Sequence, residues 1–164
     1  MTAEYDAVGI WMTQDHQVAI LVPLAVGAIA VLCTILIHAM ALGATVNFFR
    51  YERRLGRPGT GFGTDLAIVA QTISFAFVAH LIEIALWAQL FVICKEFQDF
   101  GTAYYHSAVN YTTLGYGDVI MSPSWRLLGP LEGADGALMF GVSTAMIFAV
   151  TSRIVRARFV DLRD

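Results

Sequence analysis

The sequence predicts an all-α membrane protein with three transmembrane helices and one re-entrant helix and loop between the second and the third. The 164 residues are 57% hydrophobic and only 14% charged, whereas soluble domains carry about 25% charged residues. The apolar residues also gather in long runs, which approach or exceed the about 20 residues that a helix needs to cross a bilayer. These observations favour one membrane-embedded domain over a soluble core.

The first spanning helix is expected over Val18–Val46, which contains no charged residue and one histidine, His38. A cleavable signal peptide is the alternative, but such a peptide begins with a basic segment. Residues 1–17 contain no Lys or Arg and carry Glu4, Asp6 and Asp15, which favours a retained helix. Repeated arginines, as in a voltage sensor, do not occur in this span, so the helix is expected to pack on the lipid side of the other helices.

The second span is expected over Leu66–Cys94, with Glu83 as its single charge. The third, Gly136–Ser152, is uncharged and short, and extends backward through Leu127–Leu131. Between them, the apolar stretch Ala103–Leu114 is too short to cross. It is interpreted as a re-entrant helix, which a membrane tolerates only where protein surrounds it. Cys33 and Cys94 are expected to be small packing residues rather than a disulfide.

Basic residues predict the orientation, because cytoplasmic loops carry an excess of Lys and Arg. Eight of the ten Lys and Arg residues follow the first or the third span: Arg50, Arg53, Arg54, Arg57, Arg153, Arg156, Arg158 and Arg163. The N-terminus is therefore expected outside and the C-terminus in the cytoplasm. The interpreted divisions are 1–64 (N-terminus, extra helix and an Asn47–Asp65 linker), 65–156 (the re-entrant unit) and 157–164 (a cytoplasmic tail).

A short loop, Thr112–Asp118, reads Thr-Thr-Leu-Gly-Tyr-Gly-Asp between the re-entrant helix and the third span. A dehydrated K⁺ ion needs oxygens that replace its hydration shell, and backbone carbonyls that face one axis supply them. Such a backbone needs dihedral angles that alternate in hand, and glycine reaches positive φ at the lowest cost. A glycine turn in an external loop is the alternative, but the neighbouring helices favour ion binding. The expected ion-binding residues are Thr113, Leu114, Gly115, Tyr116 and Gly117, with K⁺ at their carbonyls.

This loop resembles the Thr-Val-Gly-Tyr-Gly selectivity filter of potassium channels, with Leu114 in the Val position. Residues 65–156 resemble the pore domain of that family, in its small bacterial ion-channel type. The resemblance implies an outer helix, a pore helix, a filter and an inner helix, repeated in a tetramer. It implies filter support from Thr112, Asp118, Tyr105, His106 and Val109.

Two of the supporting positions depart from the family pattern. His106 stands where an aromatic cuff residue is common, and its alternative role is packing or hydrogen bonding to Tyr116 of a neighbouring subunit. Val109 stands where some relatives place a carboxylate behind the filter. Asp118 is expected to bond back to Tyr105.

The helix boundaries are predicted from local signals. The pore helix is expected over residues 102–112, capped by Gly101 or Thr102, and the inner helix is expected to begin at Ser122-Pro123-Ser124. Gly129 and Pro130 are expected to kink or break the inner helix. Gly136 and Gly141 are candidates for a gating hinge, with close helix packing as the alternative.

The second and third predicted spans, with the backward extension of the third, contain four ionisable residues, and such groups inside a membrane suggest function or pairing. His80, Glu83, Glu132 and Asp135 are expected to lie at similar depth and to form a polar cluster behind the pore helix. Of two carboxylates held close together, one is expected to have a raised pKa or to share a proton with its neighbour. The alternative is that Glu132 and Asp135 lie nearer the outer water and do not meet Glu83.

The leading function is a homotetrameric, K⁺-selective channel in a lipid bilayer, without enzymatic chemistry, cofactor or nucleic acid. A non-conducting regulatory subunit and a weakly selective cation channel remain alternatives. A membrane metalloenzyme is a further one, since His80 and Glu83 lie one helical turn apart. His38 and His106 lie elsewhere, and four scattered histidines are too few for the histidine boxes of membrane oxygenases.

Overall fold

The structure, a computed structural model, describes residues 2–161 and the side chains of residues 20–158. It contains four helices, α1 (Thr2–Arg54), α2 (Phe62–Ile93), α3 (Phe100–Tyr111) and α4 (Leu128–Asp161), and no strand within these residues. Three segments are long and apolar enough to cross a membrane: Ile20–Arg54, Phe62–Ile93 and Leu128–Arg158. The predicted fold class is thereby confirmed, and the protein is an integral, all-α membrane protein.

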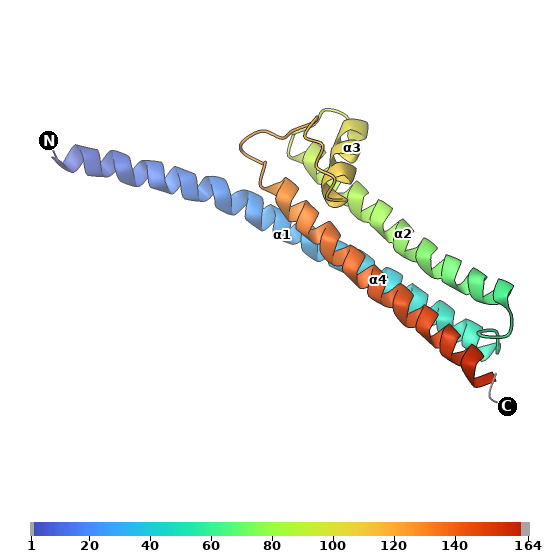
Figure 1. Ribbon diagram of the computed structural model, residues 1–164. Helices are drawn as coiled ribbons and strands as arrows, with labels where there is room; N and C mark the ends of the chain where they lie inside the picture. The colour runs from blue at the N-terminus through green and yellow to red at the C-terminus, as the bar shows by residue number, and fades with distance from the viewer. Residues whose placement is uncertain (1, 162–164) are drawn as a thin grey trace.

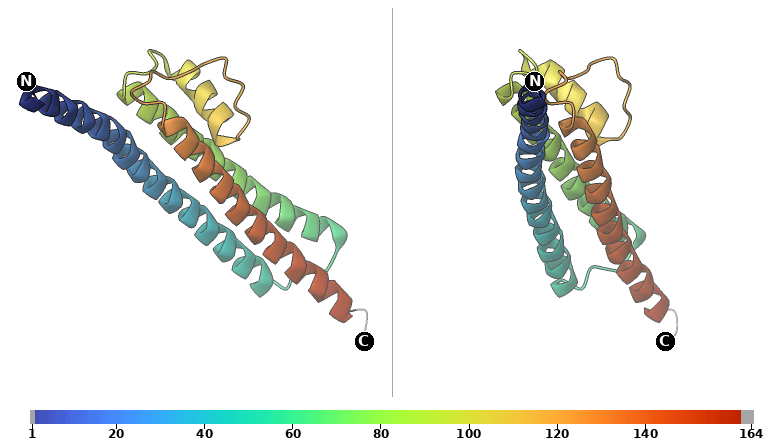
Figure 2. Two further views of the ribbon diagram at one scale, coloured as in Figure 1. Left: turned by 60° about the vertical axis from the view of Figure 1, so that its left-hand side comes forward. Right: turned by 90° about the vertical axis from the view of Figure 1, so that its left-hand side faces the viewer.

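The three long helices lie side by side, with α1 and α4 running in one direction and α2 in the other (Figure 1). α1 packs on α2 and α4, and the short α3 packs on α2 and α4 at one end of the bundle. α1 has 53 residues, which corresponds to about 80 Å at the helical rise per residue. Its first part therefore projects beyond the other helices at the α3 end (Figure 2). Pro23 lies within α1 without ending it.

The connection between α1 and α2 is shorter than the predicted Asn47–Asp65 linker. α1 continues to Arg54 and α2 begins at Phe62, so only residues 55–61 connect them. This connection contains Gly56 and Gly59, whose φ angles of 67° and 86° are incompatible with a continuing α-helix. The arginine-rich segment before them is helical, since arginine is a good helix former.

The predicted cap of the re-entrant helix was wrong by a few residues. α3 begins at Phe100, and the carboxylate of Asp99 accepts a 2.8 Å hydrogen bond from the backbone N–H of Thr102. A carboxylate both satisfies a free N–H and interacts favourably with the helix dipole. It therefore caps the helix in preference to Gly101 or Thr102. α3 ends at Tyr111, which leaves Thr112 just beyond the last turn.

The predicted start of the inner helix was also wrong, because α4 begins at Leu128 rather than at Ser122–Ser124. Ser122 is held elsewhere: its backbone N–H and its hydroxyl donate hydrogen bonds of 2.6 and 2.7 Å to the two carboxylate oxygens of Glu96. Pro130 consequently lies in the first turn of α4, where a missing N–H costs nothing. It does not kink the helix, which continues unbroken to Asp161.

The interior consists of two apolar clusters with polar side chains between them. The cluster near α3 is built around Trp87, Phe91, Tyr111 and Leu128, each fully buried. The cluster at the other end of the bundle contains Phe49, Ile68, Val150 and Ile154. Buried polar side chains from all three long helices lie between them: Thr34, His38, His80, Glu83, Asp135 and Ser143.

Candidate functional site

The backbone of the loop after α3 alternates in hand, as the ion-binding interpretation requires. Thr113, Gly115 and Gly117 have φ of 60°, 60° and 72°, and the intervening Leu114 and Tyr116 do not have positive φ. Glycine adopts these angles readily, but a residue with a side chain in this region is strained by about 1–3 kcal/mol. Thr113 therefore holds a conformation that its own preference does not favour.

Backbone hydrogen bonds to the end of α3 hold this strained turn. The N–H of Thr113 donates to the carbonyl of Asn110 at 2.8 Å. The N–H groups of Leu114 and Gly115 both donate to the carbonyl of Val109, at 3.0 and 3.2 Å. Val109, which was predicted as a filter-supporting residue, thus acts here through its backbone, while its side chain is buried.

The loop is exposed in the single chain over its whole length, Thr112–Asp118. Leu114 and Tyr116 are 55% and 68% exposed, although both are large and apolar. A cavity of about 660 Å³ lies between this loop, α3 and the start of α4. The loop therefore has one face held by its own chain and another face without protein contacts in the described residues.

The predicted bond between Asp118 and Tyr105 is present. The hydroxyl of Tyr105 donates to Oδ2 of Asp118 at 2.7 Å. This hydrogen bond lowers the pKa of Asp118 below its usual range, because it stabilises the carboxylate form. Thr112 makes a different contact, with its hydroxyl donating to the carbonyl of Ala108 at 2.7 Å. Both ends of the loop are thereby linked to α3.

His106 is buried against the rings of Phe91 and Phe97, whose centroids lie 5.5 and 4.9 Å from its own. Its Nδ1 lies 2.9 Å from the carbonyl oxygen of Val119, and its Nε2 lies 2.9 Å from the amide nitrogen of Asn110. A carbonyl only accepts, so Nδ1 carries the proton and Nε2 accepts from Asn110. Burial lowers the pKa of His106, which fits this neutral form.

Both ring nitrogens of His106 are therefore occupied within the chain. The packing role weighed for this residue fits the structure, whereas a hydrogen bond to Tyr116 of a neighbouring subunit would need a free nitrogen.

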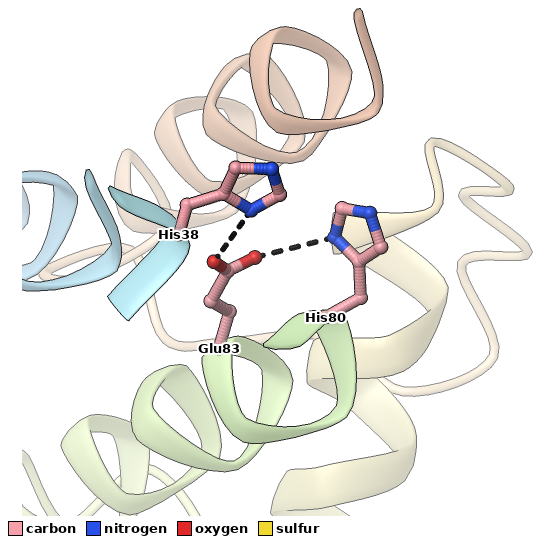
Figure 3. A group of neighbouring side chains, drawn as sticks. All are labelled: His38, His80 and Glu83. Atoms are coloured by element: carbon pink, nitrogen blue, oxygen red, sulfur yellow. Dashed lines mark hydrogen bonds and ion pairs between the residues drawn. The ribbon is translucent and has the colours of Figure 1, made fainter. Parts of the chain in front are cut away.

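The four ionisable residues predicted inside the membrane are all buried. Glu83 is bonded to Nδ1 of His38 at 2.9 Å and to Nδ1 of His80 at 3.2 Å (Figure 3). It also accepts a hydrogen bond from the hydroxyl of Tyr111. Tyr111 is the last residue of α3, so Glu83 lies against the C-terminal end of that helix. Its carboxylate joins α1, α2 and α3.

Asp135 and Glu132 on α4 have hydrogen-bond partners of their own. Asp135 accepts from Trp87 Nε1 at 3.0 Å and from the hydroxyl of Thr34. Glu132 is bonded to the hydroxyl of Ser107 on α3, and its second oxygen has no partner within the described residues. The described contacts include no hydrogen bond between two of the three carboxylates. The predicted cluster is therefore one polar layer in which each carboxylate has its own hydrogen-bond partners.

The contribution of α1 to this layer was missed. Thr34 and His38 bind Asp135 and Glu83, so α1 does more than pack on the lipid side of the bundle. The sequence signal was a helical stripe of small and polar residues in an otherwise apolar span, which the structure buries: Gly27, Ala30, Thr34, His38 and Thr45. Ser143 on α4 was also missed, and it contacts both His38 and His80.

The two candidate hinge glycines lie in different surroundings. A Cβ atom on Gly136 would overlap the carbonyl oxygen of Tyr111 and would lie 2.9 Å from its carbonyl carbon. The glycine is thus explained by close packing of α4 on the end of α3. A Cβ atom on Gly141 would meet nothing within 4 Å, so contacts within the chain do not explain that glycine.

Comparison with known proteins gives a match to one family, described as ion channel, over residues 68–153. Neither a curated protein nor a solved structure matches the chain. The matched region covers more than half of the chain and includes most of α2, the whole of α3 with its loop, and most of α4. α1 lies outside it. The chain therefore belongs to the ion channel family.

Proposed function

We propose that this protein is the subunit of a K⁺-selective channel that conducts passively as a homotetramer. The observation that carries this proposal is the positive φ at every second residue, Thr113, Gly115 and Gly117. An alternating backbone turns successive carbonyls toward one side, where they replace the hydration shell of an ion. The residues assigned to the filter are Thr113, Leu114, Gly115, Tyr116 and Gly117.

Symmetry supplies the remaining oxygens. One chain offers a single row of carbonyls, whereas a dehydrated K⁺ ion must be surrounded. The exposed loop and the open cavity beside it are consistent with a neighbouring copy on that side. The carbonyl end of α3, at Tyr111, adds the negative end of a helix dipole, which favours a cation nearby. Gly141 is proposed as the hinge of the inner helix, since Gly136 serves packing.

Flux from liposomes that contain only the purified protein tests the function. We expect K⁺ flux to exceed Na⁺ flux. Gly115→Ala and Gly117→Ala are expected to abolish selective flux, because a Cβ atom at positive φ costs roughly 1–2 kcal/mol in each subunit. Gly43→Ala is the matched control, since a Cβ atom at Gly43 would meet nothing and Gly43 lacks positive φ.

The alternatives predict different results in the same assay. Equal K⁺ and Na⁺ flux would indicate a weakly selective cation channel. Absence of flux from a protein that is well folded would indicate a regulatory subunit. Native mass spectrometry in detergent separately tests the proposed tetramer.

The orientation is proposed with the N-terminus outside and the C-terminus in the cytoplasm, from the distribution of arginines. Cysteine labelling on intact cells tests it at two described positions, Thr60 in the α1–α2 connection and Ile120 after the filter loop. In a background without Cys33 and Cys94, an impermeant reagent is expected to label Ile120→Cys and to spare Thr60→Cys. The reverse pattern would invert the topology.

A further inference from the structure

Two histidines and a glutamate converge in the polar layer between the helices. His38 comes from α1, and His80 and Glu83 come from adjacent turns of α2 (Figure 3). They are 2%, 7% and 0% exposed. One donor atom of each, imidazole nitrogen or carboxylate oxygen, lies within 4.8 Å of the others. This is a compact set of ligands of the kind that transition metals prefer.

The separations are close to those of a metal site. In a tetrahedral zinc site with bonds of 2.0–2.1 Å, neighbouring ligand atoms are about 3.4 Å apart. The distances from Nδ1 of His38 and of His80 to the two oxygens of Glu83 are 2.9 and 3.2 Å. The hydroxyl of Tyr111 is bonded to Glu83 and lies 3.1 Å from Nδ1 of His80. The Tyr111 hydroxyl provides a fourth possible ligand, after two imidazole nitrogens and one carboxylate.

The outer nitrogens of both imidazoles have the partner that metal-bound histidines need. Nε2 of His80 and Nε2 of His38 lie 3.0 and 3.1 Å from the hydroxyl oxygen of Ser143. A histidine that binds a metal through Nδ1 keeps its proton on Nε2 and donates it to a second group. A hydroxyl oxygen has two lone pairs and accepts both protons.

Counting protons shows that an ionised Glu83 and two neutral histidines do not satisfy all of these contacts. The carboxylate of Glu83 only accepts, so both Nδ1 atoms must donate to it. Both Nε2 atoms then need a donor, and Ser143 has one proton. One nitrogen is left without a partner unless a cation occupies the group, either as a bound metal or as one additional proton.

We propose that His38, His80 and Glu83 bind one divalent transition-metal ion per chain, with Zn²⁺ as the fitting ion and Tyr111 as the fourth ligand. Imidazole and carboxylate ligands suit zinc, and a buried site with four protein ligands is of the structural, closed type. Glu83 supplies one negative charge, and the neighbouring Asp135 holds a second carboxylate on α4. The ion would clamp α1, which lies outside the ion channel domain, to that domain.

The site also contacts the filter support. Tyr111 is the last residue of α3, immediately before Thr112. Metal binding through Tyr111 would restrain the C-terminal end of α3. The metal site does not depend on the ion selectivity of the channel, and its test uses no flux measurement.

Metal content of the purified, tag-free protein tests the site. The protein is stripped with a chelator, incubated with Zn²⁺, desalted and analysed by elemental mass spectrometry. We expect about one zinc ion per chain, falling below about a fifth of that in His38→Gln and Glu83→Gln. His106→Gln is the matched control, because it removes a buried histidine outside the site. The double substitution Cys33→Ala and Cys94→Ala is expected to retain the zinc and excludes thiolate binding.

Cobalt binding gives a readout that needs no variant. Co²⁺ bound in place of zinc at a four-coordinate site is expected to give a visible absorption band, which Zn²⁺ then removes. A wild-type protein without stoichiometric zinc and without this band would overturn the proposal and leave the additional proton as the cation. Equal zinc in wild type and in a His38→Gln protein with the same gel-filtration profile would overturn it too.

Discussion

The hydroxyl of Tyr105 donates a 2.7 Å hydrogen bond to Asp118, the residue that follows Gly115-Tyr116-Gly117. Tyr105 lies in the middle of α3 and Asp118 lies beyond the strained turn at Thr113. The bond therefore closes a loop whose other end is anchored by backbone bonds to Val109 and Asn110. Both side chains are on the surface of the single chain, so the bond restrains the loop locally.

Removal of this bond is expected to loosen the loop without unfolding the protein. Tyr105→Phe should shorten the time for which K⁺ flux persists after opening, because one of the two restraints on the loop is lost. Tyr104→Phe removes a hydroxyl from the adjacent position of α3 and serves as the control. The decay of single-channel activity in planar bilayers measures the effect, and identical decay in both variants would contradict it.

The two candidate hinge glycines of α4, Gly136 and Gly141, are expected to respond oppositely to substitution by alanine. Gly136→Ala places a Cβ atom against the carbonyl of Tyr111, and such overpacking costs about 1–3 kcal/mol. Gly141→Ala meets no neighbour and gains about 0.5–1 kcal/mol in a helix. The melting temperature of the detergent-solubilised protein checks both. A stable Gly136→Ala protein would contradict the close approach of α4 to α3.

Altered opening in Gly141→Ala, at unchanged or higher stability, is expected if that glycine is the hinge. Single-channel open probability measures it. Unchanged gating would remove Gly141 as the hinge.

Acid is expected to weaken the filter support through His106. Burial lowers the pKa of His106, with its other charged neighbours Asp118 and Glu96 acting in the opposite direction. A histidine whose pKa is lower in the folded than in the unfolded chain makes the free energy of unfolding decrease as the pH falls below the unfolded-state pKa, near 6.5. Its protonation also turns Nε2 into a donor toward the amide of Asn110. External pH below about 6.5 should therefore reduce flux.

His106→Phe is the test of that pH dependence. The ring remains between Phe91 and Phe97, but it no longer titrates, so the external pH response should flatten above pH 5. The hydrogen bond that lowers the pKa of Asp118 keeps that group ionised in this window. A pH response that is unchanged in His106→Phe would assign the effect to another group.

The N-terminal end of α2 and the C-terminal end of α4 are joined by an ion pair. Nε of Arg158 lies 2.7 Å from Oδ2 of Asp65, whose other oxygen accepts a 2.8 Å bond from the N–H of Gly59. Asp65→Asn and Arg158→Gln are each expected to lower stability by about 1 kcal/mol, since Arg158 is partly exposed. The double variant should lose no more stability than either single variant, because the two residues act as a pair.

Thermal unfolding of the four proteins completes this cycle. Arg156→Gln is the control, since Arg156 is exposed at the same end of α4. Strictly additive losses for Asp65 and Arg158 would show that the pair contributes nothing as a pair.

Helix ends show where local signals fail. Gly101 and Ser122 were reasonable local candidates for helix starts. Asp99 caps α3 instead of Gly101, and Glu96 binds Ser122 and holds it in the loop before α4. Ser122 lies 26 residues from Glu96 along the chain. Pairing over that distance depends on how α2, α3 and α4 pack, which no local pattern encodes.

Hydropathy determined the three spans and the re-entrant helix by itself, because a bilayer imposes one length and one polarity on every segment that crosses it. The positive φ of Gly115 and Gly117 was equally predictable, since glycine adopts it at low cost, whereas the positive φ of Thr113 was not predicted. Tertiary structure decided the partners of the buried polar groups. His38 meets Glu83 and Ser143 across three helices, and Gly136 faces Tyr111. These contacts depend on helix rotation and depth, which are fixed by packing between helices and not by the sequence of any one of them.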